Sequence, residues 1–254
     1  MAHKTVFLTG ASSGLGYGLA LHYARAGATV YGVARRGERL ERLAAEAHAS
    51  GGGRVIPVAL DVTDGEALAA AVRAAEEAAG GSLDVVVANA GLGDPTPADR
   101  IDWRLVKRIL DVNASAACVT LASSLPAMVA RGRGTVVAIS SLAAFRGLPS
   151  SAAYCASKAA LDVFMESLRV DLRGTGVRAL TIHPGFVNTE GAVHDRFPRP
   201  FAMKTADAVR IMARAIDRGA AVTAFPFPLA ALARMARVLP RVLYEPLARG
   251  RRTG

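Results

Sequence analysis

Apolar and polar positions alternate in blocks along this chain. Short runs rich in Val, Ile, Leu and Thr recur at intervals, and longer Ala-rich stretches with helical spacing separate them. Most of the short runs are apolar at consecutive positions, which is typical of strands that are covered on both faces. Strands that alternate with helices in this way predict βαβ units around a parallel sheet, so we expect an α/β fold.

The expected elements fill most of the chain up to residue 226. Strands are predicted at Thr5–Thr9, Thr29–Ala34, Arg54–Leu60, Asp84–Ala88, Thr135–Ser140, Val177–His183 and Ala221–Phe225. Helices are predicted at Leu15–Ala26, Gly37–Ala49, Asp64–Ala79, Trp103–Ala130, Ala152–Thr175 and Thr205–Arg218. We therefore expect residues 1–226 to form one domain and residues 227–254 to form a C-terminal extension.

Composition narrows the possible functions. The 254 residues are 52% hydrophobic and 20% charged, with a formal net charge of +10, which is typical of a globular protein with a basic surface. This charge favours an anionic cofactor, an acidic substrate or an anionic membrane surface, unless it serves only to solvate the protein. The basic residues are scattered and no recognition helix is evident, so we expect no nucleic-acid partner.

Cysteines, histidines and the N-terminus exclude further classes. The two cysteines, Cys118 and Cys155, and five dispersed histidines predict neither a disulfide framework nor a metal site. The N-terminus runs into a strand without a signal peptide, and we find no apolar stretch of the roughly 18 residues that span a bilayer. A cytoplasmic protein is therefore expected.

A glycine-rich loop, Thr9–Gly16, follows the first predicted strand and leads into a helix. Its glycines are Gly10, Gly14 and Gly16, with Ser12, Ser13 and Leu15 between them. Glycine lets the backbone approach a pyrophosphate closely, and the start of the helix offers free N–H groups to it. The loop therefore predicts a dinucleotide site.

The end of the second strand indicates which dinucleotide binds. Arg35 and Arg36 stand where an acidic residue would bind the ribose of NAD, and arginine there suits the 2′-phosphate of NADP. We therefore favour NADP(H) over NAD(H), with Ser12 or Ser13 as a further donor; the alternative is that both arginines are only solvated. Asp61, followed by Val62, either binds the adenine amino group or caps the next helix, although Thr63 or Asp64 suits that cap better.

Tyr154 and Lys158 are the candidate proton-transfer pair, because their spacing places the phenol and the ammonium on one face of a helix. A tyrosine that acts near neutral pH needs its pKa lowered by about three units from ~10, or roughly 4 kcal/mol. An ammonium ~4 Å away supplies about that much at an effective dielectric of ~20, so the site must be sheltered. Ser140–Ser141 and Asn89–Gly91 end two strands at the edge where such sheets bind ligands.

Together these residues closely resemble a known family. The set Thr9–Gly16, Asn89-Ala90-Gly91, Asn113, Ser141, Tyr154-x-x-x-Lys158 and Pro184-Gly185-x-x-x-Thr189 has the order and spacing of the classical short-chain dehydrogenases/reductases, over roughly Lys4 to Phe225. The resemblance implies a Rossmann-like, doubly wound sheet of seven parallel strands, in the order 3-2-1-4-5-6-7, with helices on both faces. It also implies a homodimer or homotetramer.

The resemblance assigns a role to each residue. Tyr154 would be the general acid in reduction and the base in oxidation, and Lys158 would bind the nicotinamide ribose and lower the pKa of the tyrosine. Ser141 would orient the substrate oxygen, and Asn113 would complete a proton relay, holding Lys158 through water. The implied cofactor contacts also include Asn89, Ala90, Gly91, Pro184, Gly185, Val187 and Thr189.

Two segments remain open at this point. Residues Phe186–Ala202, with His194, Arg196 and Arg199, correspond to the family's substrate lid, and His183 before them either faces the substrate or is a buried, hydrogen-bonded histidine. In the extension, Leu229, Leu232, Ala233, Ala236 and Leu239 follow a helical stripe, with Arg234, Arg237 and Arg241 on another face. This basic amphipathic segment predicts weak membrane contact, subunit contact or a cover over the substrate site.

We expect an oxidoreductase that interconverts a small carbonyl compound and an alcohol by hydride transfer with NADP(H). One alternative is a sensor or scaffold that binds NADP(H) without catalysis. Another is a membrane-peripheral reductase of a lipid-like substrate.

Overall fold

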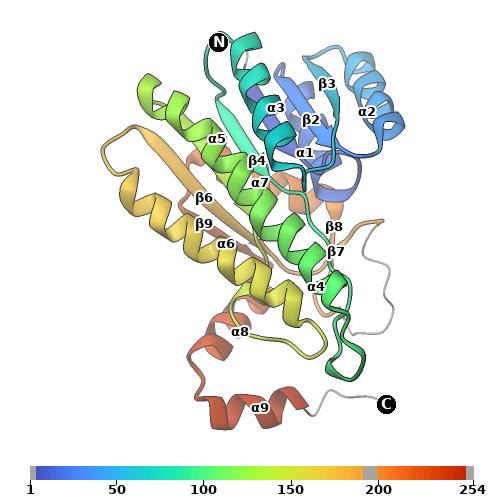
Figure 1. Ribbon diagram of the computed structural model, residues 1–254, viewed down its shortest axis with the longest axis vertical. Helices are drawn as coiled ribbons and strands as arrows, with labels where there is room; N and C mark the ends of the chain where they lie inside the picture. Colours follow the sequence, from blue (N-terminus) through green and yellow to red (C-terminus); the bar gives the residue numbers. More distant parts are fainter. Residues whose placement is uncertain (1–3, 191–198, 250–254) are drawn as a thin grey trace.

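Three layers make up the fold, a central sheet with helices on both faces (Figure 1). The computed structural model describes residues 4–190 and 199–249. Seven strands form one sheet in the order β3-β2-β1-β4-β5-β6-β9, and every neighbouring pair is parallel. This is the predicted order, with β9 as the seventh strand, and the doubly wound α/β fold is confirmed.

The predicted strands and helices are present with small differences at their ends. The sheet contains β1 (Thr5–Thr9), β2 (Thr29–Ala34), β3 (Arg54–Ala59), β4 (Val85–Ala88), β5 (Gly134–Ile139), β6 (Val177–Pro184) and β9 (Val222–Phe225). The helices are α1 (Gly14–Arg25), α2 (Gly37–Ala49), α3 (Gly65–Ala78), α4 (Trp103–Leu110), α5 (Ala116–Arg131), α6 (Ala152–Asp171), α7 (Thr205–Arg218), α8 (Phe227–Val238) and α9 (Arg241–Arg249). A short pair, β7 (Val187–Asn188) with β8 (Met203–Lys204), was not expected.

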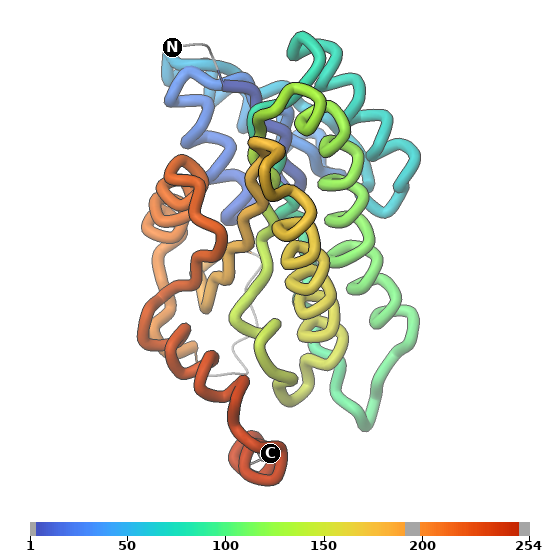
Figure 2. The backbone as a smooth tube through the Cα atoms, turned by 90° about the vertical axis from the view of Figure 1, so that its left-hand side faces the viewer, coloured from blue at the N-terminus to red at the C-terminus, as the bar shows by residue number. Residues whose placement is uncertain are grey.

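An apolar core lies on each face of the sheet. Leu19 of α1, Leu40 of α2 and Met212 of α7 belong to one core, and Leu121 of α5 and Leu161 of α6 belong to the other. All five side chains are fully buried, and burial of each is worth about 1.5–3 kcal/mol. The two helices of the C-terminal extension, α8 and α9, lie at the end of the molecule opposite the N-terminus (Figure 2).

The long helix predicted at Trp103–Ala130 is not a regular α-helix throughout. Residues Asp111–Ser115 form a π-helical turn between α4 and α5, and Asn113 within it is fully buried. Single π turns inside helices recur at functional sites. This segment contains no glycine or proline, so the sequence carries no local signal for the interruption.

The same long helix corrects the expectation that no stretch could span a bilayer. By length and composition, Trp103–Arg131 qualifies as a candidate span, because an 18-residue stretch within it has a mean hydropathy of 1.4. It packs against α3, β4 and β5, however, and Leu121 and Met128 are fully buried in the core. These contacts identify it as a core helix of the α/β fold, a kind of helix that passes the same test.

Candidate active site

The glycine-rich loop turns sharply after β1. Gly10 has a φ of +73°, and its N–H donates to the carbonyl oxygen of Val33 at 2.8 Å. A Cβ atom at Gly16 would lie 2.2 Å from the Gly10 carbonyl oxygen, and one at Gly10 would lie 2.8 Å from the Cα of Ala90. Only glycine fits these positions, and the loop directs the start of α1 to the carboxyl edge of the sheet, as a dinucleotide site requires.

Asn89, at the end of β4, holds this loop in place. Its Nδ2 donates to the carbonyl oxygens of Thr9 at 3.0 Å and Gly10 at 3.3 Å. The backbone N–H groups of Asn89 and Ala90 donate to the Thr9 hydroxyl at 3.0 and 3.2 Å. The structure thus brings two of the predicted cofactor segments together, and the Asn89 side chain serves the shape of the loop.

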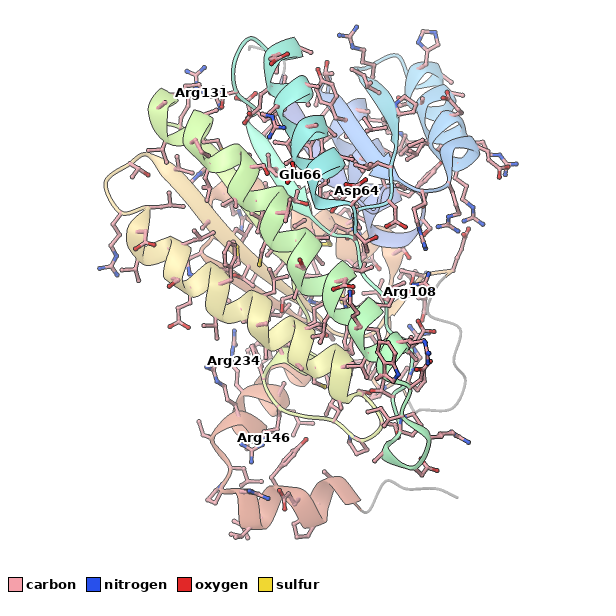
Figure 3. All side chains as sticks on the ribbon, viewed as in Figure 1. Asp64, Glu66, Arg108, Arg131, Arg146 and Arg234 are labelled. Atoms are coloured by element: carbon pink, nitrogen blue, oxygen red, sulfur yellow. The ribbon has the colours of Figure 1, made fainter. Side chains whose placement is uncertain are left out.

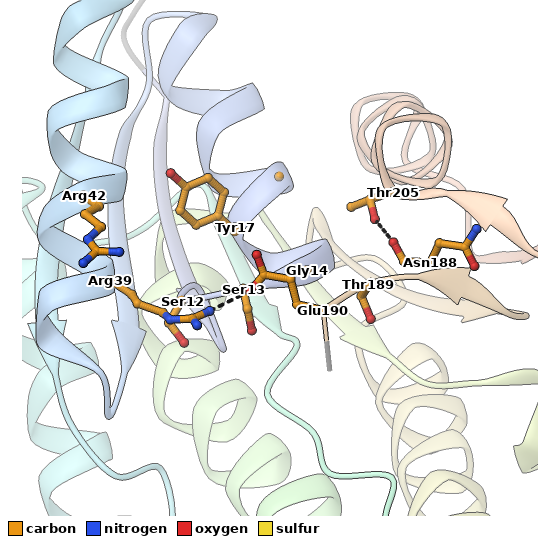
Figure 4. A pocket seen from close by; sticks show the side chains of 11 residues that line it. Ser12, Ser13, Gly14, Tyr17, Arg39, Arg42, Asn188, Thr189, Glu190 and Thr205 are labelled. Carbon is orange, nitrogen blue, oxygen red and sulfur yellow. Dashed lines mark hydrogen bonds and ion pairs between the residues drawn. The ribbon is translucent and has the colours of Figure 1, made fainter. Parts of the chain in front are cut away.

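Arginines border the loop on the α2 side. Arg36 donates to the Ser12 hydroxyl at 2.9 Å and to the Ser13 hydroxyl at 3.0 Å. Arg39 forms an ion pair with Glu190 at 2.7 Å, across a groove of about 510 Å³ (Figure 4). The groove is also lined by Gly14, Tyr17, Gly18, Arg42, Asn188, Thr189 and Thr205. Several cations and hydroxyl groups therefore face the place where the sequence predicts a phosphate.

Arg35 and Asp61 lie together at a second groove beside α4. Arg35 Nη1 is 3.8 Å from Asp61 Oδ2. The backbone N–H of Thr63 donates to Asp61 Oδ1 at 3.0 Å and, as the main cause, holds the pKa of Asp61 below its usual value. Asp64 caps α3 by accepting from the N–H of Ala67 at 3.0 Å, as expected, which leaves Asp61 at the sheet edge.

Ser141 and the phenol of Tyr154 meet at the end of β5. The Ser141 hydroxyl accepts from the Ala143 N–H at 3.1 Å and is hydrogen-bonded to Tyr154. Burial raises the pKa of Tyr154, and the Ser141 hydrogen bond only partly opposes this. Lys158 Nζ lies 6.0 Å from the centre of the tyrosine ring. The net shift of the Tyr154 pKa is therefore upward, because desolvation of the phenol is its largest cause.

Lys158 is itself buried, with only 4% of the residue exposed. Its Nζ donates to the carbonyl oxygen of Ile139 at 2.7 Å. Burial lowers the pKa of Lys158 to about 8, and the carboxylate of Asp162, one turn further along α6, partly opposes this. The ammonium also borders Gly91, where a Cβ atom would lie 3.7 Å from Nζ.

Asn113 reaches the same segment from the π-helical turn. Its Oδ1 accepts from the Leu92 N–H at 2.7 Å, and its Nδ2 donates to the Leu92 carbonyl at 2.9 Å and to Ser157 Oγ at 3.0 Å. Ser157 in turn donates to the Tyr154 carbonyl at 2.7 Å. Asn113 therefore ties the chain after β4 to the helix that carries Tyr154. Ser157 could not be identified from the sequence, because it is a serine inside an Ala-rich helix.

His183 at the end of β6 is buried and hydrogen-bonded, the second of the two expectations. Its Nε2 lies 2.8 Å from Asp162 Oδ2, and its ring packs on Phe145 with 4.8 Å between ring centres. Sequence reasoning missed Asp162, although its position four residues after Lys158 places it on the same helix face. The side chains of Tyr154, Lys158 and Asp162 thus form one row along α6.

The last predicted cofactor segment follows β6. Gly185 donates to the Phe225 carbonyl oxygen at 2.7 Å, and a Cβ atom at Gly14 would lie 3.1 Å from Thr189, so this segment reaches the glycine-rich loop. Val187 is buried, and its carbonyl oxygen accepts from Arg199. Of the predicted lid, residues 191–198, with His194 and Arg196, lie outside the described residues.

Comparison with known proteins decides the family. The family model for short chain dehydrogenases matches residues 4–197. The chain belongs to the short-chain dehydrogenases. An uncharacterized oxidoreductase of Myxococcus xanthus strain DK1622 is 53% identical to this short-chain dehydrogenase over 249 residues, which cover 98% of each chain. The family that the motifs indicated is thereby confirmed, and with it the class of oxidoreductases.

Two more distant relatives carry more specific names. The ketoacyl reductase HetN of Nostoc sp. is 35% identical over 192 residues, which cover 76% of this short-chain dehydrogenase and 66% of that protein. A short-chain dehydrogenase of Sphingobium yanoikuyae, solved in complex with NADPH, superimposes with a TM-score of 0.81 at 28% identity over 90% of each chain.

Proposed function

We propose that this short-chain dehydrogenase interconverts a carbonyl compound and an alcohol with NADP(H). The observation that carries the proposal is the meeting of Ser141, Tyr154 and Lys158 with the glycine-rich loop at one edge of the sheet. When bound, the dinucleotide supplies or accepts the hydride. The residues of this chain bind and orient the reactants and move the proton.

The proton step follows from the raised pKa of Tyr154. A neutral phenol is the correct form for a general acid, so in reduction Tyr154 gives its proton to the oxygen of the carbonyl group. Ser141 holds that oxygen beside the phenol. The tyrosinate that forms is stabilised by the ammonium of Lys158, since a buried negative charge is costly unless a positive charge is close. Oxidation of an alcohol runs through the same groups in reverse.

The choice of NADP(H) rests on the arginines beside α2. Arg36 already donates to Ser12 and Ser13, and Arg39 and Arg42 line the same groove. Guanidinium groups recognise phosphate by paired hydrogen bonds, which suits a 2′-phosphate. The NADPH complex of the Sphingobium yanoikuyae protein supports this choice.

Titration of the purified protein with NADPH and NADH, followed by nicotinamide fluorescence, tests cofactor choice. We expect NADPH to bind about tenfold more tightly or better, and Arg36→Ala to remove most of that preference with little effect on NADH. Equal affinities for NADPH and NADH would refute the proposed preference for NADP(H). Tyr154→Phe should abolish NADPH-linked turnover of a panel of aldehydes and ketones while NADPH binding is kept, whereas a sensor without catalysis would show no turnover in either protein.

We also propose that the protein forms a homodimer or homotetramer through α5 and α6. Val163 and Val170 on α6 and Val129 on α5 are large apolar side chains exposed to solvent. Light scattering should give a multiple of 26.3 kDa for the wild type and a smaller mass for Val163→Glu. A wild-type protein of monomer mass would contradict the proposal.

A further inference from the structure

The C-terminal helices α8 and α9 carry an unusual number of exposed apolar side chains. Seven large apolar residues in these helices are each at least 54% exposed. They are Phe227, Leu232, Met235 and Val238 on α8 and Val242, Leu243 and Leu247 on α9. Single exposed apolar residues are common on soluble proteins, but a group of this size in two consecutive helices marks an interaction surface.

The exposed residues of α8 form a face of their own. Phe227, Met235 and Val238 lie on one side of the helix by their spacing, with the half-buried Ala231 between them. Ala230 is fully buried and lies on the side that packs against β9 and the turn after β5. The expected stripe through Leu229, Ala233, Ala236 and Leu239 is thus the partly buried side, and Leu232, expected in it, is exposed. The helix therefore has apolar residues on both sides, which the sequence stripe did not reveal.

The charged residues of the sequence after Pro226 are almost all positive. After Pro226 the sequence holds six arginines and one acidic residue, Glu245. Glu245 is paired with Arg241 at 2.6 Å. Arg234 and Arg237 are exposed on α8, and Figure 3 shows Arg234 and Arg146 beside the two helices. An exposed apolar face flanked by arginines matches a surface of anionic headgroups above an acyl interior.

We propose that α8 and α9 bind the surface of an anionic phospholipid bilayer. A second copy of this chain is a poorer partner for the face, because it would bring a further net charge of +10 and the same arginines against it. A bilayer requires no matching pocket, accepts the apolar residues and supplies the opposite charge. The proposal concerns docking alone and does not depend on the reaction assigned above.

The docking helices are also attached to the candidate active site. The guanidinium of Arg237 lies 5.8 Å from the ring centre of Phe145, the residue that packs on His183. Arg146 lies 4.5 Å from the ring centre of Tyr244, whose hydroxyl donates to the Gly147 carbonyl. Docking would therefore place the segment between β5 and α6, next to Ser141 and Tyr154, close to the membrane.

Vesicle co-sedimentation of the full chain tests the proposal. We expect strong binding to vesicles of equal parts phosphatidylglycerol and phosphatidylcholine, weakened by about tenfold in ~0.5 M salt, and little binding to phosphatidylcholine alone. Met235→Glu, on the exposed face of α8, should weaken binding by about tenfold or more. The control Val222→Glu changes an exposed valine at the start of β9, outside the docking helices, and should bind as the wild type does.

Three results would overturn the proposal. The first is equal binding to neutral and anionic vesicles, and the second is full binding by Met235→Glu. The third is that the wild type does not bind vesicles, while light scattering gives a smaller mass for Met235→Glu than for the wild type. The last result would assign the face to a second copy of the chain. Tyr154→Phe should bind vesicles like the wild type, so a failure of docking and a failure of the proposed chemistry can be told apart.

Discussion

Replacing Lys158 by Met should stabilise the protein at neutral pH. Burial lowers the pKa of this lysine from 10.5 to about 8. Because the unfolded chain holds the proton more tightly, the charged lysine destabilises the folded state by about 1.4 kcal/mol per pKa unit, or roughly 3 kcal/mol in all. Loss of the hydrogen bond to Ile139 costs about 1 kcal/mol. The substitution should therefore raise the free energy of unfolding by about 2 kcal/mol at pH 7.

The sign of this difference should change with pH. Below pH 8 the folded protein carries the full cost of the buried charge, and as pH rises from about 8 to 10.5 the folded lysine loses its proton and that cost disappears. Near pH 10.5 the variant should be less stable than the wild type by the lost hydrogen bond alone. Urea unfolding of both proteins near pH 7 and pH 10 measures the change.

A matched control separates this effect from general titration. Lys107 is exposed and paired with Asp111, so Lys107→Met, measured at the same two pH values, is the control for replacing a surface lysine. A stability difference for Lys158→Met that is the same at both pH values would refute the reasoning, because it would show that Lys158 titrates alike in the folded and unfolded chains.

Three further predictions concern other residues of the candidate site. Asp162→Asn removes the carboxylate that raises the pKa of Lys158, so the alkaline fall in kcat/KM should move to lower pH; an unchanged pH profile would exclude this coupling. Gly16→Ala should reduce NADPH affinity by more than tenfold and lower the Tm, whereas Gly93→Ala, with open space around it, should change neither. Asn113→Ala should lower the free energy of unfolding by about 2–4 kcal/mol in urea titration, since it leaves buried polar groups unpaired.

The sheet and its helices were predictable because their signals are local. The strand Thr29–Ala34 and the helices Gly37–Ala49 and Thr205–Arg218 match their predicted ends residue for residue. In each, the apolar spacing and the flanking residues specify the element before any tertiary contact forms. The π-helical turn at Asp111–Ser115 and the outward apolar face of α8 were not predictable in this way, because packing against the rest of the fold determines both.

The candidate site, too, could be predicted only in part from the sequence. Its members could be placed from sequence, because the carboxyl ends of parallel strands converge on one edge and motif spacing fixes which residues stand there. The direction of the pKa shift of Tyr154 could not be predicted from the sequence, since it depends on how much water the folded site excludes. Ser157 and the carbonyl oxygen of Ile139 bind catalytic candidates, yet their residue types carry no chemical signal in the sequence.

The opposite pKa shifts of Tyr154 and Lys158 have one physical cause. Burial raises the pKa of Tyr154 and lowers the pKa of Lys158, so the site disfavours a lone charge on either side chain. In the proposed reaction Tyr154 releases its proton, and the new negative charge would form beside a lysine that lacks a full counter-charge, so that the pair is better stabilised than either charge alone. On this proposed mechanism, the buried ammonium destabilises the resting protein and stabilises the charge that develops in the reaction. Stability and activity should therefore change in opposite directions at this position, and a Lys158→Met protein that gained stability and kept full turnover would break the argument.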